Sequence, residues 1–393
     1  MSAVTSQNED YLARAHRRRR RISPPLVGFG LVLLGWWLMG ALVIGADPYN
    51  LYPWGLSPKV GDAEYGEGAV PFLVDVVAKD PSIDTVLIGG SQTLPITRRM
   101  MENTLPGTHR AFNLSYFAPR GIDRERVAHE IAAFSHAKRV ILSIDWIYVT
   151  DDNAERPGFP DYLYDGTPTN DPRTLDRDGL RLAAQTLVGQ PLWLAKWDYA
   201  SYARSIERDY RTFQQPHPMK SLAASIEAHK SDVLNSSGKT CKDFASIRTH
   251  LVPFANALAK KHIALDIYIP PMSLSVFYTW MDLPQNARLG RDTFTADYLA
   301  YQACLVKALA GIEGVKIFSF DNEDWLTADL KNYYEPAHMF GDKNFEYVLR
   351  AIAEGSHHLT PENVDQTVKT LRQRIANYHL KNTNFRDVYA TDQ

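Results

Sequence analysis

A serine that follows a short apolar run is the first residue of this chain whose type and place could do chemistry. Residues 83–89 (IDTVLIG) predict a strand, and Gly90, Ser91, Gln92 and Thr93 come directly after it. A serine in the first turn after a strand sits on exposed amides at the start of the next helix, where a nucleophile belongs. A structural serine that caps a helix is the commoner use of the pattern. Thr93 stands where the G-x-S-x-G turn of α/β-hydrolases needs glycine, which disfavours that class.

An acidic residue three positions before a histidine supplies the other groups that such a serine needs. Glu335-Pro336-Ala337-His338 follows the apolar run 315–320 (VKIFSF) in a polar stretch. On one tight turn, a carboxylate can hold an imidazole in the tautomer that draws a proton from a serine. Ser91, His338 and Glu335 are therefore the candidate nucleophile, base and orienting acid.

Two other uses of this acid and histidine stay open. The pair could be half of a di-iron carboxylate site, which needs a second copy on facing helices, and Pro336 argues against a place inside a helix. His338 could also be a loop histidine that bonds a backbone carbonyl. The sequence implies no metal and no organic cofactor.

Taken together, these motifs resemble the SGNH/GDSL esterase superfamily. The resemblance is to its membrane-anchored bacterial branch, similar to alginate O-acetylation proteins and the teichoic-acid D-alanyl transfer protein, and it spans roughly residues 80–360. Ser91 falls on the family's nucleophile, His338 on its histidine, and Glu335 replaces the aspartate of the D-x-x-H block. The resemblance implies a flavodoxin-type three-layer α/β/α sandwich with a parallel sheet, and a serine acyl-enzyme.

The blocks that hold the oxyanion in this family are only partly present. Residues 113–118 (NLSYFA) resemble the N-L-x-x-x-G block, which implies an oxyanion hole made by the amides of Ser91 and Ala118, with Asn113 as a further donor. The G-x-N-D block falls on residues 143–146 (SIDW), so its asparagine is missing. Losing one such donor costs about 3 to 4 kcal/mol of transition-state stabilisation. Asp145 is a fallback orienter for His338 or, as we favour, a residue of the turn at a strand end.

Alternating strands and helices must position these residues. Such alternation predicts a parallel sheet with helices on both faces, and a ligand site at its carboxyl edge. An insertion over residues 150–235 at that edge is rich in Pro, Asp and Tyr and then helical, and some of its aromatic residues could stack on sugar rings instead of packing in the core. Strands are expected at 83–89, 111–114, 139–146, 264–269 and 315–320, helices at 97–105, 124–136 and after Pro361, and the sugar-stacking candidates are Tyr162, Tyr164, Trp193 and Trp197.

The N-terminal part predicts a membrane anchor. Residues 26–46 carry no charge, and a helix of that length spans about 30 Å, the thickness of the bilayer hydrocarbon. Five arginines at 17–21 precede it, so the N-terminus is expected in the cytoplasm and the body outside the inner membrane. A cleaved signal peptide is the alternative, but the apolar run is long and residues 44–46 (IGA) form a poor cleavage site. Cys241 and Cys304 could pair in that oxidising space, although nothing in the sequence places them close enough.

Composition excludes other classes of protein. With 45% hydrophobic and 22% charged residues the chain is a folded protein, and a net charge of −2 with the arginines gathered at the N-terminus disfavours a nucleic-acid-binding body. The expected organisation is a cytoplasmic basic tail (1–25), a transmembrane helix (26–46), a linker or strap (47–80), an SGNH-like domain (81–360), and a C-terminal helix and tail (361–393).

The function that these expectations favour is acyl chemistry on a polysaccharide. We expect a periplasm-facing, single-pass O-acyltransferase or esterase whose partners are a cell-envelope or exported polysaccharide, the inner membrane and a membrane-bound acyltransferase. The alternative is a non-catalytic accessory protein that binds glycan or scaffolds such an acyltransferase. The missing asparagine favours the accessory protein, and the retained Ser91 and His338 favour the enzyme.

Overall fold

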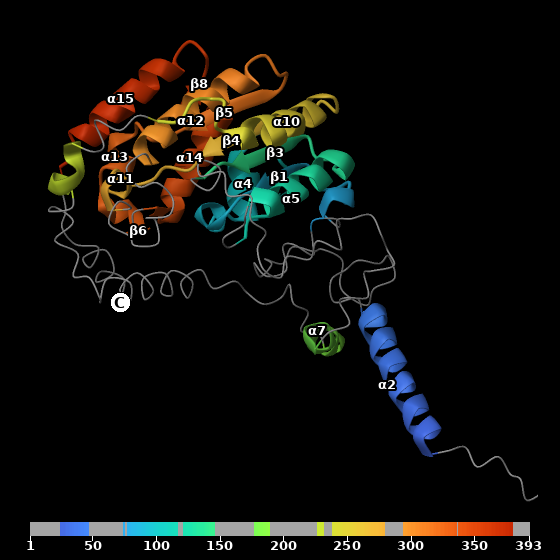
Figure 1. Cartoon of the computed structure of the whole chain (residues 1–393). Coiled ribbons are helices and arrows are strands. Elements are labelled where there is room, and N and C mark those ends of the chain that lie inside the picture. Colours follow the sequence, from blue (N-terminus) through green and yellow to red (C-terminus); the bar gives the residue numbers. More distant parts are fainter. Residues whose placement is uncertain are drawn as a thin grey trace, which may run out of the picture.

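A mostly parallel six-stranded sheet forms the centre of the protein (Figure 1). The computed structural model describes residues 24–46, 74, 77–116, 121–145, 177–188, 226–231, 238–279, 294–335 and 337–379. The strand order is β2-β1-β3-β4-β5-β8, with the first five parallel and β8 antiparallel to β5. The strands are β1 (Thr85–Ile88), β2 (Ala111–Asn113), β3 (Arg139–Ser143), β4 (Ala264–Ile269), β5 (Val315–Ser319) and β8 (His358–Leu359). The order 2-1-3-4-5 is a doubly wound arrangement whose direction reverses next to β1.

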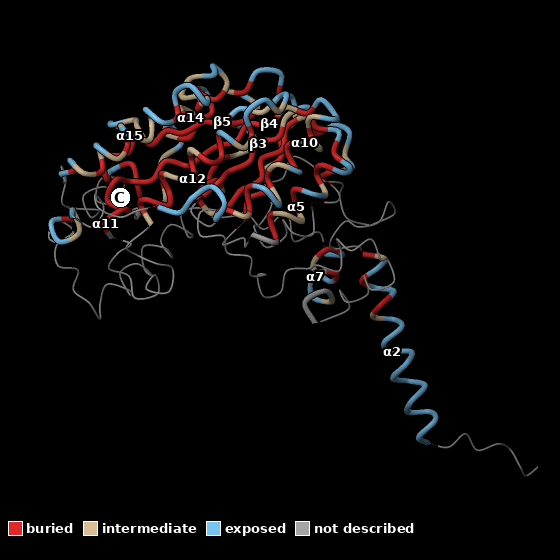
Figure 2. Tube along the Cα trace, turned by 45° about the horizontal axis from the view of Figure 1, so that its top comes forward, coloured by how far each residue is buried: buried red, intermediate tan, exposed pale blue. Residues whose placement is uncertain are grey.

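Helices cover both faces of the sheet, because its central strands are apolar on both sides. On one face α5 (Gly121–Phe134), α10 (Val252–Ala259), α12 (Phe294–Leu309) and α15 (Val364–Ala376) pack against a cluster that contains Val86 and Ile88. On the other face α4 (Arg98–Thr104) and α14 (Asp342–Glu354) pack against a second cluster that contains Leu87. Figure 2 shows the strands as the buried middle layer. The predicted α/β architecture with a mostly parallel sheet is confirmed.

The five strands expected from the sequence are all present, each within a few residues of its predicted range. The predicted helices at 97–105 and 124–136 correspond to α4 and α5, and Thr97 caps α4 by accepting a hydrogen bond from the Met100 N–H at 3.1 Å. Strand β8 was missed. It has two residues and is antiparallel, so no apolar run marks it in the sequence.

A second, two-stranded sheet lies between β5 and α14 in the chain. Its strands are β6 (Tyr333–Glu335) and β7 (His338–Met339), and they pair antiparallel. The short helices α13 (Asp324–Thr327) and η10 (Leu330–Asn332) connect β5 to this hairpin. His338 was expected in a polar loop, whereas it begins strand β7.

Helix α2 (Pro24–Ala46) is long and apolar enough to cross a membrane. It agrees closely with the span predicted at 26–46, and its large apolar side chains are exposed, for example Trp37 at 67%. Helix α7 (Arg177–Leu187) lies beside its last turns, where Val43 and Ala46 pack with Ala183 (Figure 1). The expected helical character of the insertion at 150–235 agrees with α7, and most of its remaining residues, including the four sugar-stacking candidates, lie outside the described residues.

Two chain segments contribute more to the core than the sequence indicated. Val74, Val77 and Ala78, in the segment expected to be a strap, are buried in the cluster under α5. The helix predicted after Pro361 is α15, and its Leu371 and Ile375 are buried in the same cluster. The described residues at the end of the predicted strap and the helix after Pro361 are therefore part of the hydrophobic core.

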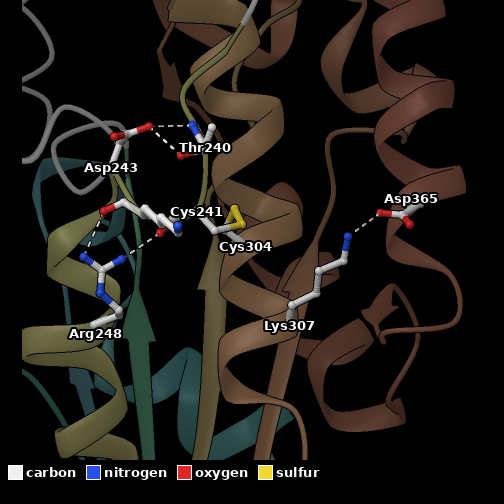
Figure 3. The surroundings of a disulfide bond; sticks show 8 residues. Thr240, Cys241, Asp243, Arg248, Cys304, Lys307 and Asp365 are labelled. Carbon is white, nitrogen blue, oxygen red and sulfur yellow. Dashed lines mark hydrogen bonds and ion pairs between the residues drawn. A yellow bond between two sulfur atoms is a disulfide. The ribbon is translucent and has the colours of Figure 1, made fainter.

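A disulfide joins Cys241 to Cys304, with 5.3 Å between their Cα atoms (Figure 3). It ties the loop before η6 (Ile247–Leu251) to the middle of α12. Arg248 holds the same loop by donating to the Cys241 and Lys242 carbonyls at 2.9 and 2.8 Å. The pairing that the sequence left open is therefore present, and its place depends on the tertiary fold.

Candidate active site

Ser91 lies at the carboxyl end of β1, where the strand order reverses. It begins a short 3-10 helix, η2 (Ser91–Thr93), which is separated from the strand by Gly89 and Gly90. Gly89 has no room for a side chain, since a Cβ there would overlap the Thr93 hydroxyl and come within 2.9 Å of Ser115 Oγ. The small residues of the Gly-Gly-Ser motif thus let the turn close tightly against β2 and β3, and this edge is where parallel sheets bind ligands.

Residues after β2 hold the serine turn in place. The Thr93 hydroxyl lies 2.8 Å from Ser115 Oγ and donates to the Gly90 carbonyl at 3.0 Å. The Asn113 side-chain amide donates to the carbonyls of Thr93 and Ile96 at 2.9 and 2.7 Å, and its oxygen accepts from the Ser115 N–H at 2.8 Å. The N-L-S motif is therefore a clamp on the turn that carries Ser91.

The β6–β7 hairpin brings His338 to the serine. His338 Nε2 and Ser91 Oγ lie 2.8 Å apart, although 247 positions separate the two residues. The predicted proximity is therefore confirmed. Next to this contact, Gln92 donates to the Ala337 carbonyl at 2.7 Å and joins η2 directly to the hairpin turn. Gln92 was not predicted as a site residue, because the only feature in the sequence that singles it out is its position next to Ser91.

Chemically, this pair can activate a hydroxyl. With Nε2 unprotonated, the Ser91 O–H donates to it, which is the arrangement a general base needs to take the proton as the oxygen attacks a carbonyl carbon. Both side chains are part-buried, so a substrate can reach them. Their catalytic role stays a prediction.

Glu335 is opposite His338 in the backbone pairing of β6 and β7. That pairing places the acid and the histidine next to each other on one hairpin, as the motif indicated. The side chain of Glu335 lies outside the described residues, so its role as orienting acid stays a prediction.

The structure describes two of the three candidates for the oxyanion hole. The Ser91 N–H is at the start of η2, where a 3-10 helix leaves its first amides without a partner inside the helix. Asn113 is used differently from the expectation, because both hydrogens of its amide are bonded to backbone carbonyls and none is left for an oxyanion in this arrangement. Ala118 lies outside the described residues.

Asp145 lies beyond the end of β3, as favoured for a turn residue, and it also has a structural partner. It forms a two-pronged ion pair with Arg124 of α5, with nitrogen–oxygen distances of 3.1 and 2.5 Å. The Arg124 side chain is 0% exposed and that of Asp145 5%. This ion pair fastens the start of α5 to the edge of the sheet that carries Ser91.

Asp321, two residues after β5, is the centre of a buried polar cluster beneath the hairpin. Its Oδ2 accepts hydrogen bonds from Tyr298, Gln302 and Ser319 at 2.8, 2.7 and 3.2 Å, whereas its Oδ1 is without a partner among the described residues. Burial raises the pKa of Asp321 to about 6, although the three hydrogen bonds favour the charged form and act to lower the pKa. Burial and then the charge of Asp321 also raise the pKa of Tyr333, the first residue of β6.

This raised pKa predicts a loss of stability as the pH rises. Because the folded state holds the Asp321 proton more tightly than the unfolded chain, the free energy of unfolding falls between about pH 4 and pH 6, by on the order of 3 kcal/mol, and is level above that range. Urea unfolding at a series of pH values should show this decline in the wild type relative to Asp321→Asn, which has no proton to lose. Parallel pH profiles for the two proteins would contradict the prediction.

Among the described residues, no group of His, Cys, Asp and Glu side chains is arranged to hold a metal ion. In comparisons with known proteins, no family model, no curated protein and no solved structure matches this chain. What the site can do therefore has to be argued from its own geometry.

Proposed function

We propose that this protein is a serine-dependent O-acyltransferase or esterase that acts on acyl groups of a cell-envelope or exported polysaccharide. The observation that carries the proposal is the 2.8 Å contact between Ser91 Oγ and His338 Nε2 at the carboxyl edge of the sheet. A serine next to a base in a part-buried site is the minimal apparatus for forming an acyl-enzyme. The strand order and the order of serine and histidine along the chain support an SGNH-type sandwich as the finer description of the fold.

In the first half of the proposed reaction, Ser91 Oγ attacks the acyl carbonyl carbon while His338 Nε2 takes the hydroxyl proton. The oxyanion of the tetrahedral intermediate accepts a hydrogen bond from the Ser91 N–H and, in our proposal, from that of Ala118. The carbon–oxygen bond to the donor alcohol then breaks, and His338 returns the proton to the leaving oxygen. The acyl group is left as an ester on Ser91.

In the second half, a sugar hydroxyl or water gives its proton to His338 and attacks that ester. As the second intermediate collapses, the bond between the acyl carbon and Ser91 Oγ breaks, His338 returns the proton to Ser91 Oγ, and the acyl group stays on the acceptor. Transfer to sugar is favoured over hydrolysis, because the chain lacks the asparagine donor of the third block and has a tether, which raises the effective concentration of a membrane-held donor.

We further propose that the N-terminus is cytoplasmic and the body periplasmic or extracellular. Helix α2 and the preceding arginines support this orientation, and so does the disulfide, since such bonds persist in oxidising compartments. Protease added to spheroplasts is expected to degrade the body while a tag fused to the N-terminus stays protected. Full protection of the body would rule this orientation out.

The function is tested in cells by the acyl content of the polysaccharide. Cells that lack the protein should regain O-acylation when they carry the wild-type gene and fail to regain it with Ser91→Ala. If Ser91→Ala restores acylation as well as the wild type does, the protein is the non-catalytic accessory component instead. If deletion raises the acyl content, the protein is a deacylase and the preference for transfer is wrong.

A further inference from the structure

An exposed aromatic platform lies at the edge of the sheet formed by β5 and β8. It consists of Trp325 on α13, Tyr347 on α14, Glu323 directly before α13, and His357 directly before β8. We name it the Trp325 platform. Trp325 is 46% exposed, an unusual exposure for so large an apolar side chain. The Trp325 and Tyr347 rings meet edge to face, with centroids 4.9 Å apart at 84°.

The platform is held rigid by one carboxylate. Glu323 accepts a hydrogen bond from Trp325 Nε1 at 3.0 Å and lies 2.7 Å from His357 Nε2. The His357 ring stacks in turn on Phe320, with centroids 4.9 Å apart. The hydrogen bond from Nε1 and the edge-to-face contact with Tyr347 restrict how the indole can turn, and the indole is otherwise carbon. A fixed ring loses little conformational entropy when a ligand binds to it.

His357 adopts an unusual backbone conformation to complete this support. Its φ angle is +63°, in the left-handed region that non-glycine residues seldom adopt. The Ser319 N–H donates to the His357 carbonyl at 3.2 Å and fixes the residue at the end of β5. His357 is therefore held in a strained backbone conformation at the position from which its imidazole contacts Glu323 and Phe320.

Hydrogen bonds and contacts connect the platform to the proposed active site. Asn332 donates to the Trp325 carbonyl at 2.7 Å, and its own carbonyl accepts from the Phe340 N–H at the end of the hairpin at 2.7 Å. Helix α13 contacts η10, η10 contacts β6, and β7 contacts η2, which carries Ser91. These contacts join the element that carries Trp325 to the hairpin that carries His338 and to the turn that carries Ser91.

From this arrangement we infer that the Trp325 platform is a carbohydrate subsite that binds a pyranose ring of the acceptor polysaccharide. The apolar face of a sugar ring packs on exposed aromatic carbon, and its hydroxyls find polar groups at the rim. The inference rests on the proposed function, which makes a polysaccharide the substrate.

Charge favours a sugar over a cationic ligand. Both carboxylates of this segment already have partners, Glu323 with His357 and Asp324 with Arg374 Nη2 at 3.1 Å. A site for an ammonium group needs negative charge or several ring faces turned toward one point. Here the carboxylates are paired, and Trp325 and Tyr347 meet edge to face.

Binding is tested with the full-length chain in lipid nanodiscs, in a Ser91→Ala background so that no acyl chemistry takes place. The probe is a fraction of about six-sugar oligosaccharides prepared from deacylated polysaccharide of the producing cells, titrated by calorimetry. Trp325→Ala is expected to weaken the Kd about tenfold, and Trp325→Phe less, since a ring remains. Phe134→Ala is the matched control, because Phe134 is also exposed, at 49%, but ends α5, a helix that contacts α10 and β1.

The result that overturns the inference is equal binding by the Trp325→Ala and Phe134→Ala proteins, or no binding by their parent. Saturable binding of phosphocholine that is lost in Trp325→Ala, without oligosaccharide binding, would identify a cationic ligand and overturn it too. Circular dichroism checks that each variant is folded. The proposed function fails separately, when Ser91-dependent acyl chemistry is absent although oligosaccharides bind at Trp325.

Discussion

Replacement of Ser91 by alanine is expected to abolish hydrolysis of 4-nitrophenyl acetate by the purified full-length protein, with kcat/KM falling by about 10³-fold or more. The reason is that Ser91 Oγ, 2.8 Å from His338 Nε2, is the nucleophile whose proton this base is placed to take. His338→Ala should lose about as much, because a serine hydroxyl is inert near neutral pH without an adjacent base. The double variant should lose no more than either single one, since the two groups act as a unit.

The size of the loss in Glu335→Gln separates orientation from base catalysis. An orienting residue acts on the substrate only through the imidazole. Glu335→Gln should therefore lower kcat less than His338→Ala does, and it should leave KM unchanged. For Ser91→Ala, the matched control is Ser82→Ala, because Ser82 is an exposed serine in the turn before β1.

Wild-type turnover is expected to be slow, because each missing oxyanion donor costs about 3 to 4 kcal/mol of transition-state stabilisation. Undiminished turnover in Ser91→Ala would exclude the acyl-enzyme.

Asp145→Ala is expected to lower the free energy of unfolding by about 3 to 5 kcal/mol. The substitution leaves the Arg124 guanidinium, which is 0% exposed, without the carboxylate that now binds it through two hydrogen bonds. Urea unfolding of the detergent-solubilised chain measures the loss. Replacing both residues, as in Arg124→Met with Asp145→Leu, should recover most of it, because apolar side chains of similar volume avoid the cost of burying charge.

An exposed ion pair provides the control for this prediction. Lys307 Nζ lies 3.1 Å from Asp365 Oδ1, and the two side chains are 55% and 73% exposed (Figure 3). Asp365→Ala should change the free energy of unfolding by less than about 1 kcal/mol, since water screens and solvates such a pair. A similar loss in Asp365→Ala and Asp145→Ala would show that burial does not decide the contribution of the Arg124–Asp145 pair.

How much could be predicted from the sequence depends on whether a feature is local. The strand at β4 was predicted at its observed bounds because five of its six residues (ALDIYI) are apolar and a proline follows. Helix α2 was predicted from an uncharged run of the length that a bilayer requires. Ser91 and His338 were predicted as site residues because each stands in a short motif of recognisable chemistry. Such a motif can be recognised without knowing the distance between the two residues.

The features that the sequence did not reveal are contacts between distant segments. Asn113 was expected to face an oxyanion, but its amide fits between two carbonyls of the serine turn, an arrangement that depends on how closely β2 lies to β1. The short strands β6, β7 and β8 have too few residues to show a period, and pairing across the sheet creates them.

Sequence alone thus determined where the longer strands and helices lie and which residue types could react, since hydrophobic period and motif are properties of neighbouring residues. The tertiary structure decided which of those residues meet. The disulfide between Cys241 and Cys304, the pairing of Asp145 with Arg124, and the gathering of Trp325, Tyr347 and His357 each join parts of the chain that no local pattern connects. The physical reason is that side-chain contacts form only after the sheet has set the distances and directions of the elements that carry them.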